Sequence, residues 1–107
     1  MSYRVNLTET AKQDLREIVL YIAEQSKDKE IARSFANELR EKCGRLADFP
    51  QAGARPKDHV LRSLEYRFIP HKDYLIFYSI DEKKKAVNVL AVFNARKDYL
   101  HVMRRLV

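Results

Sequence analysis

The chain has 107 residues, of which 46% are hydrophobic and 34% are charged, and its net charge is +6. This composition excludes a disordered chain and fits one domain, which we place over residues 1–107. No apolar run approaches the ~20 residues that span a bilayer, no signal peptide is recognisable, and the single cysteine excludes a disulfide framework. We expect a cytoplasmic protein with no membrane contact, cofactor or metal.

The positive charge is concentrated in the second half of the chain. Residues 1–58 hold 11 basic and 10 acidic side chains, whereas residues 59–107 hold 10 basic and 5 acidic ones. A concentrated positive charge attracts polyanions or an acidic protein, although it also serves solubility alone. The sequence contains no long run of lysine or arginine that would indicate a basic tail.

The first half of the sequence predicts a short strand followed by two helices. Apolar and polar residues alternate over residues 3–7, as in a half-buried strand. Thr8 or Thr10 caps the first helix, and Thr10 with the glutamine three residues later fits a capping box. Asp28 is the expected N-cap of a second helix that ends before Pro50. The turn between the two helices is short, so they should form an antiparallel hairpin.

The second half changes to the pattern of strands. We expect strands over residues 61–68, 74–80 and 87–93, a turn over residues 70–73 and a short helix in the tail. The last strand is apolar on both faces, so both faces should be covered. Helices that precede a run of strands pack on one face of an antiparallel sheet. The predicted fold class is α+β: an N-terminal strand, a helical hairpin on a three- to four-stranded antiparallel sheet, and a short C-terminal helix.

Histidine and cysteine, the usual reactive side chains, form no recognisable motif. There is no glycine-rich phosphate loop and no zinc-binding spacing. His59, His71 and His101 have no carboxylate partner suggested by their spacing, so we expect them to be solvated. Cys43 lies on the apolar stripe of the second helix and is expected to be a buried, inert thiol.

A scattered basic set in the second half could support RNA cleavage without a metal. That reaction needs a base for the 2′-hydroxyl, a cation for the phosphate and an acid for the leaving oxygen. The side chains that could supply these groups are Arg62, Arg67, Arg96, Tyr99 and His101. If Arg62 and Arg67 lie on one strand, their odd spacing places them on opposite faces. The same residues would also fit an ordinary basic surface.

The order and spacing of several short segments resemble toxins of the RelE/ParE superfamily of bacterial type II toxin–antitoxin pairs. The resemblance covers nearly the whole chain and agrees with the predicted helical hairpin on a sheet. It rests on residues 11–18 with Tyr21 and Ile22, and on residues 46–53, 61–64, 74–78 and 89–98.

The resemblance implies one of two activities. RelE-like toxins cleave messenger RNA on the ribosome and commonly carry an arginine in the central strand, within a Tyr-Arg-x-x-Tyr pattern. ParE-like toxins inhibit DNA gyrase. Leu75 occupies the arginine position here, so the ParE-like branch is favoured, with a gyrase inhibitor that acts by binding rather than as an enzyme. The alternatives are a ribosome-dependent endoribonuclease acting on messenger RNA and a non-toxic basic binding module. The expected target-binding residues are Arg62, Arg96 and Lys97.

A cognate antitoxin protein is the partner that the resemblance implies. The positive charge favours an acidic antitoxin segment that folds on contact. The helices and the tail carry more apolar side chains than one sheet face can cover, which predicts a groove for a helix or an added strand. A homodimer of the free chain through the same surface is the alternative. The residues expected to bind the antitoxin are Ile18, Tyr21, Ile22, Phe35, Val102 and Met103.

Overall fold

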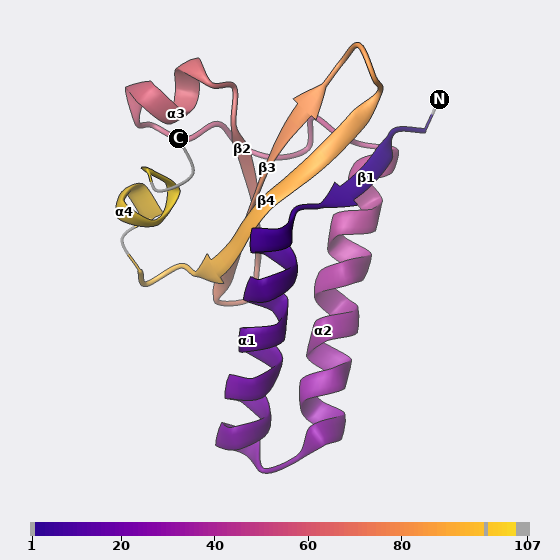
Figure 1. The fold of residues 1–107 in the computed structure, drawn as a ribbon, viewed down its shortest axis with the longest axis vertical. Coiled ribbons are helices and arrows are strands. Elements are labelled where there is room, and N and C mark those ends of the chain that lie inside the picture. Colours follow the sequence, from indigo (N-terminus) through magenta and orange to yellow (C-terminus); the bar gives the residue numbers. More distant parts are fainter. Residues whose placement is uncertain (1, 98, 105–107) are drawn as a thin grey trace.

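The computed structural model describes residues 2–97 and 99–104 and has the predicted α+β fold (Figure 1). Nine elements follow one another along the chain: β1 (Arg4–Leu7), α1 (Glu9–Ser26), α2 (Lys29–Gly44), the 3-10 turn η1 (Arg45–Ala47), α3 (His59–Ser63), β2 (Arg67–His71), β3 (Tyr74–Asp81), β4 (Ala86–Asn94) and α4 (Tyr99–Arg104). No helix in the described ranges combines the length and the apolar character that crossing a bilayer requires.

The four strands form one sheet in the order β1-β4-β3-β2. The β2–β3 and β3–β4 pairs are antiparallel, with a register shift between Phe77 and Tyr78. The β1–β4 pair is parallel and joins residues 4–7 to residues 86–89. The alternation of side chains predicts the strands but not this pairing, because α1 and α2 intervene before the chain returns to the sheet. The sheet is therefore mixed rather than wholly antiparallel.

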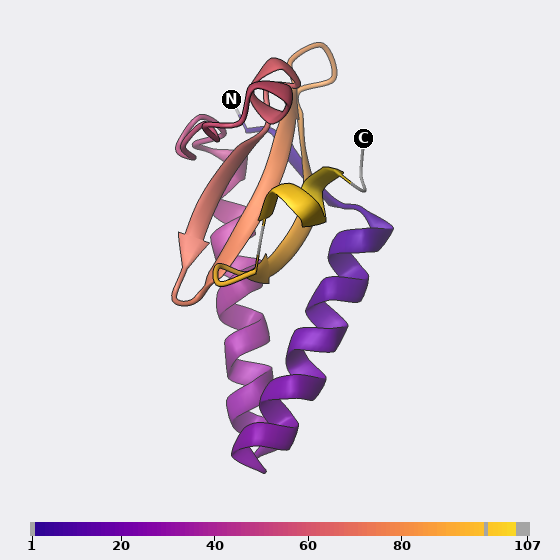
Figure 2. The ribbon, with the colours of Figure 1, turned by 90° about the vertical axis from the view of Figure 1, so that its left-hand side faces the viewer.

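Helices cover both faces of the sheet, as the apolar faces of the last strand predict (Figure 2). The α1–α2 hairpin packs on one face and extends past the end of the sheet, while α3 and α4 lie on the other (Figure 1). The core on the hairpin face includes Leu15, Leu39, Ile76 and Val89. The core on the opposite face consists of Leu61, Phe77, Ala91, Phe93 and Met103.

Side-chain caps define where the two long helices begin. Thr8, not Thr10, caps α1, because its hydroxyl accepts a hydrogen bond from the backbone N–H of Ala11 at 3.2 Å. The same hydroxyl donates to the carbonyl of Val89 at 2.9 Å and so attaches the start of α1 to β4, which explains why the capping box at Thr10 is wrong. Asp28 caps α2 as predicted, accepting from the N–H of Glu30 at 2.9 Å.

The predicted strand over residues 61–68 is wrong except at its last two residues, Arg67 and Phe68. Residues 59–63 form α3, whose first turn is capped by Asp58 accepting from the N–H of Leu61 at 3.1 Å. Leu61 is buried while Val60 and Leu64 are exposed, so one apolar anchor is enough to hold this short helix. Strand β2 starts only at Arg67 and includes Pro70 and His71, so the predicted turn over residues 70–73 is confirmed only at residues 72–73.

A buried tyrosine fixes the loop between η1 and α3 to the sheet. The Tyr78 hydroxyl donates to the carbonyl of Pro50 at 2.7 Å and accepts from the N–H of Gly53 at 2.8 Å. The guanidinium of Arg67 donates to the carbonyl of Gly53 at 2.9 Å. Burial raises the pKa of Tyr78, so the hydroxyl keeps its proton and both hydrogen bonds at neutral pH.

A second connection joins α2 to the turn between β2 and β3. His71 Nε2 lies 2.9 Å from Glu38 Oε1, and Lys72 Nζ lies 3.0 Å from the same oxygen. The prediction of a solvated His71 without a carboxylate partner is therefore wrong, because its partner lies 33 residues away in the sequence. The His71 side chain is only 17% exposed and also contacts the Phe35 ring.

Glu38 should make the stability of the protein depend on pH. The hydrogen bonds from His71 and Lys72 hold the pKa of Glu38 below that of a free glutamate. The stabilising effect of Glu38 is therefore present above its unfolded-state pKa and is lost as the pH falls through its folded-state pKa. We expect Glu38→Gln to lower the melting temperature at pH 7 and to match the wild type at acidic pH. Thermal melts across this range test the prediction, with Glu41→Gln as an exposed control on the same helix. A difference that persists unchanged at low pH would contradict it.

Candidate functional site

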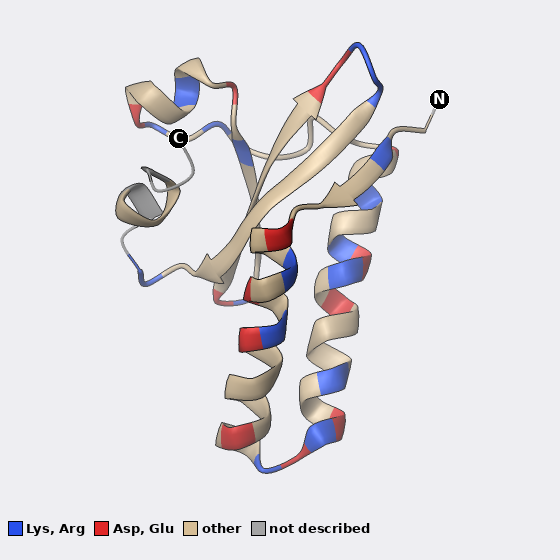
Figure 3. Cartoon of the chain, in the orientation of Figure 1, with Lys and Arg blue, Asp and Glu red and all other residues tan. Residues whose placement is uncertain are grey.

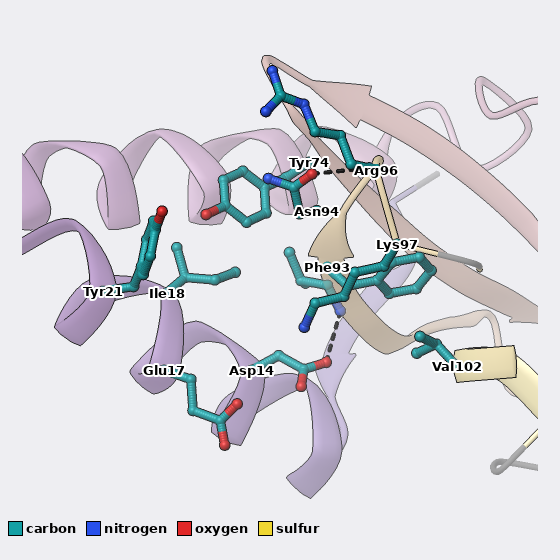
Figure 4. Close-up of a pocket in the computed structure, with 11 residues that line it drawn as sticks. Asp14, Glu17, Ile18, Tyr21, Tyr74, Phe93, Asn94, Arg96, Lys97 and Val102 are labelled. Atoms are coloured by element: carbon teal, nitrogen blue, oxygen red, sulfur yellow. Dashed lines mark hydrogen bonds between the residues drawn. The ribbon is translucent and has the colours of Figure 1, made fainter. Parts of the chain in front are cut away.

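A pocket of about 550 Å³ lies between α1 and the C-terminal end of β4 (Figure 4). We call it the α1–β4 pocket. Helix α1 supplies one wall, β4 and the turn after it supply the other, and β3 and α4 each contribute one residue. The lining residues are Asp14, Glu17, Ile18, Tyr21, Tyr74, Val92, Phe93, Asn94, Arg96, Lys97 and Val102.

Asp14 joins the two walls of the α1–β4 pocket. Its Oδ2 accepts a hydrogen bond from the backbone N–H of Val92 at 2.9 Å. Strand β1 pairs with β4 only as far as Val89, so beyond this residue β4 has no strand neighbour on that side among residues 2–97 and 99–104. The carboxylate of Asp14 thus occupies a position on β4 that a neighbouring strand would otherwise fill.

Side chains of both charges line the α1–β4 pocket. Asp14 and Glu17 project from α1, and of the two basic residues after β4, Lys97 extends toward them while the Arg96 guanidinium points away (Figure 4). Asn94 positions the basic turn, since its side-chain oxygen accepts from the N–H of Arg96 at 2.9 Å and its carbonyl accepts from the N–H of Lys97 at 3.0 Å. Such a surface suits a ligand that presents both charges, and a polypeptide is the obvious class.

The titratable groups of the pocket are poorly suited to proton transfer. Burial raises the pKa of Tyr74, so its hydroxyl remains protonated at neutral pH and cannot act as a base. None of the histidines is among the lining residues. Cys43 lies elsewhere in the core, where burial raises the pKa of its thiol to about 11, as expected for an inert cysteine.

A second pocket, of about 580 Å³, continues along the same side of α1 toward its N-terminus. The two pockets share Asp14, Glu17 and Val102. The second is more polar, and the residues it adds are Glu9, Thr10, Gln13, Arg16 and Ala91. Because the two pockets share lining residues they are adjacent, and we call them together the groove beside β4.

The basic residues proposed from sequence do not gather in one place. Arg96 and Lys97 line the α1–β4 pocket, whereas Arg67 is bonded to Gly53 near the other end of the sheet. The register places Arg67 opposite Tyr78 and His71 opposite Tyr74, which in turn pairs with Asn94. Arg67 is thus four residues, or about 13 Å along the strand, from the end of the sheet that Arg96 follows.

The remaining candidates for RNA cleavage lie on the two short helices. Arg62 is an exposed residue of α3, and Tyr99 and His101 belong to α4. Neither Arg62 nor His101 lines the α1–β4 pocket. The structure therefore brings Arg96 and Lys97 together and leaves Arg62 and Arg67 apart from them.

The apolar residues proposed for the antitoxin differ in how accessible they are. Tyr21 is 57% exposed, whereas Ile18 is 7% exposed, and both line the α1–β4 pocket together with the half-buried Val102. Met103, on α4 itself, is fully buried against the sheet. Ile22 and Phe35 are half-buried and pack against the core on the hairpin face.

Sequence reasoning missed the polar residues that complete the pocket. Asp14 precedes Ile18 by four residues and Tyr21 by seven, which places all three on one side of α1. The sequence signal for Asp14 is a carboxylate next to the apolar stripe of α1. Tyr74 and Asn94 reach the pocket only because β3 and β4 pair at these two residues, which a single sequence does not reveal.

Comparison with solved structures supports the fold. A chain of the chromosomal ParDE toxin–antitoxin system of P. aeruginosa superposes with a TM-score of 0.72 and 14% identity, covering 87% of this chain and 96% of that one. The E. coli toxin RelE, as a double-arginine mutant in the free state, gives 0.66 and 16%, with full coverage of both chains. The RelBE2 complex of Mycobacterium tuberculosis gives 0.62 and 20%, covering 88% and 99%.

Comparison of sequences identifies the family. No curated protein sequence matches the chain. The family model described as the ParE toxin of the type II toxin–antitoxin system parDE matches residues 5–99, from β1 to the first residue of α4. This range includes both walls of the α1–β4 pocket. The chain therefore belongs to the ParE toxin family of type II toxin–antitoxin systems.

Proposed function

We propose that this toxin inhibits DNA gyrase by binding it in the cytoplasm, and that a cognate antitoxin neutralises it. The observation that supports binding over catalysis is the absence of lysine, arginine and histidine from the two central strands, β3 and β4. A catalytic site for RNA needs a cation held rigidly against the phosphate, and a central strand is the most rigid position that the fold offers.

Leu75 occupies the strand position at which RelE-like toxins commonly carry an arginine. It lies in β3 and packs against the core formed by Leu61, Phe77 and Phe93, so this part of the sheet is closed by apolar contacts under α3 and α4. The accessible cations Arg96 and Lys97 instead lie in a turn beyond the end of β4. A turn of this kind suits contact with a macromolecular target better than the fixed geometry of acid–base catalysis.

The function is tested with two assays on the same purified protein. The proposal predicts inhibition of plasmid supercoiling by gyrase and no cleavage of messenger RNA during translation in vitro. Cleavage of translated messenger with supercoiling unaffected would replace the proposal with the ribosome-dependent endoribonuclease. Inactivity in both assays, with the protein folded, would leave a non-toxic binding module.

The antitoxin is proposed to bind along the groove beside β4. Beyond Val89 no described strand pairs with this edge of β4, where Asp14 accepts from the Val92 N–H, and the groove next to it has an apolar floor and charged walls. An acidic segment can place its carboxylates near Arg96 and Lys97 while its apolar side chains cover Ile18 and Val102. Light scattering of the toxin alone and with the antitoxin separates this arrangement from a homodimer, which would bury the same surface and exclude the antitoxin.

Arg96→Ala should weaken gyrase inhibition without affecting the fold. Arg96 is exposed and its side chain makes no ion pair with any described residue, so its loss should change the free energy of unfolding by no more than about 0.5 kcal/mol. Dose–response curves for supercoiling should shift to higher toxin concentration, whereas Arg40→Ala, an exposed control on α2, should leave them unchanged. A matching fall in melting temperature would instead make Arg96 a structural residue.

A further inference from the structure

Three segments that are distant in sequence bring five basic residues to one end of the sheet. The N–H of Arg4 donates to the carbonyl of Lys85 at 2.9 Å, and the N–H of Tyr3 donates to the carbonyl of Ala47 at 2.7 Å. These bonds fasten β1 between the β3–β4 turn and η1. Figure 3 shows basic positions on the β3–β4 turn, at the start of β1 and beside the end of α2. We call this surface the basic end, and it consists of Arg4, Arg45, Lys83, Lys84 and Lys85.

The two carboxylates of the β3–β4 turn region, Asp81 and Glu82, are engaged in local contacts. Asp81 Oδ1 accepts from the N–H of Lys84 at 3.1 Å and shapes the turn. Glu82 Oε2 accepts from the Tyr3 hydroxyl at 2.8 Å and lies 3.6 Å from Lys85 Nζ. The side chains of Arg4, Arg45, Lys83 and Lys84 are exposed and make no ion pair with any residue in the described part of the chain.

The basic end and the α1–β4 pocket lie at opposite ends of β4. Arg4 pairs with Ala86 at the start of this strand, whereas the pocket begins at Val92 and continues past Asn94. The nine residues from Ala86 to Asn94 span about 26 Å. A ligand at the basic end would therefore leave the pocket free for gyrase or the antitoxin.

We propose that the basic end binds the phosphate backbone of duplex DNA. Exposed lysine and arginine side chains contact phosphates without reading sequence. Single-stranded nucleic acid additionally needs free aromatic faces on which bases stack. Tyr3 offers none, because its ring packs against the core on the hairpin face and Lys85 Nζ lies 5.4 Å from the ring centroid. The exposed ring of Phe49, just after η1, is a single platform, which is fewer than a run of stacked bases needs. Contact limited to charge favours a duplex, whose phosphates are closely spaced along a rigid surface.

The test measures the affinity of the purified toxin for a fluorescently labelled duplex of about 20 base pairs at several salt concentrations. The variant Lys83→Glu/Lys84→Glu removes the centre of the basic end. The control Lys27→Glu/Lys29→Glu makes the same change in net charge at the far tip of the α1–α2 hairpin, where both lysines are exposed. Circular dichroism melts confirm that both variants are folded before binding is compared.

We expect the wild type to bind with a steep salt dependence and the basic-end variant to bind on the order of tenfold more weakly. Its slope of log Kd against log salt should be smaller by about 2, since each phosphate contact contributes about 0.9. The control should differ from the wild type by less than about threefold. Equal weakening in both variants, no measurable binding by the wild type, or tight binding to polyglutamate but not to the duplex would each overturn the proposal.

The outcome is independent of the gyrase assay. The basic-end variant retains every residue of the α1–β4 pocket, so loss of DNA binding with gyrase inhibition intact would support two separate surfaces. If the toxin does not bind the duplex but still inhibits gyrase, the DNA-binding proposal is rejected and the proposed function stands. DNA binding without gyrase inhibition would reject the proposed function and leave this inference standing.

Discussion

Gly53→Ala is expected to destabilise the protein by on the order of 3 kcal/mol, through overpacking and the loss of the Tyr78 hydrogen bonds. A Cβ at this position would lie 2.5 Å from the Tyr78 hydroxyl oxygen and 2.8 Å from the carbonyl oxygen of Phe68. The Phe68 carbonyl belongs to β2 and cannot move without disturbing the sheet, so the loop must leave its place. Chemical denaturation followed by circular dichroism measures the loss.

The other glycine of the chain provides a matched control. A Cβ added to Gly44, at the end of α2, would have no neighbour within 4 Å. Gly44→Ala should leave stability unchanged or raise it by about 0.5 kcal/mol, because alanine loses less backbone entropy in a helix. Equal effects of the two substitutions would show that the Tyr78 contacts do not hold the loop.

Met103→Glu is expected to release α4 from the sheet. Met103 is fully buried against Leu61, Phe77 and Phe93, and a helix of six residues is not stable without such contacts. Burying a carboxylate there without a partner costs several kcal/mol, so detachment of α4 is the cheaper response. Hydrogen exchange should show loss of protection in residues 99–104 while α1 and α2 keep theirs.

Met103→Glu should affect the candidate site as well as the fold. Val102 lies on α4 and lines both pockets, so release of α4 removes part of their wall and should weaken gyrase inhibition. His101→Gln, at an exposed position of the same helix, is the control. Cooperative unfolding of the whole protein by Met103→Glu would show instead that α4 is an inseparable part of the core.

The elements that the sequence predicts well are those with local causes. The apolar stripes of α1 and α2 and the cap at Asp28 depend on neighbouring residues, and both helices occur where expected. α3 was missed because its segment contains Val60, Leu61 and Leu64 in a short apolar pattern that a strand could also have. The parallel β1–β4 pairing does not depend on neighbouring residues, so the alternation of apolar and polar residues along each strand does not predict it.

In the candidate site, too, the residues placed by local patterns are predictable from the sequence, and those placed by tertiary contacts are not. Tyr21 and Ile18 follow from the helix period, and Arg96 from its position after a predicted strand. The pairing of His71 with Glu38, and of Asp14 with the Val92 backbone, depends on distances across the fold between residues far apart in the chain. Tertiary contacts of this kind set the roles of polar residues, whereas sequence periodicity mainly indicates which apolar residues are buried.

The parallel pairing of β1 with β4 has a consequence for how the protein is made. Ribosomes add about 5–20 residues per second, so the α1–α2 hairpin, whose contacts are local, can form while the later strands are still being synthesised. Strand β1 cannot pair until later, since its only strand partner in the described part of the chain is residues 86–89. The wall of the pocket opposite α1 is made later still, with Val92 to Lys97. A nascent chain interrupted before β4 therefore has neither a complete sheet nor the groove beside it, and such fragments should be harmless to the cell that makes them.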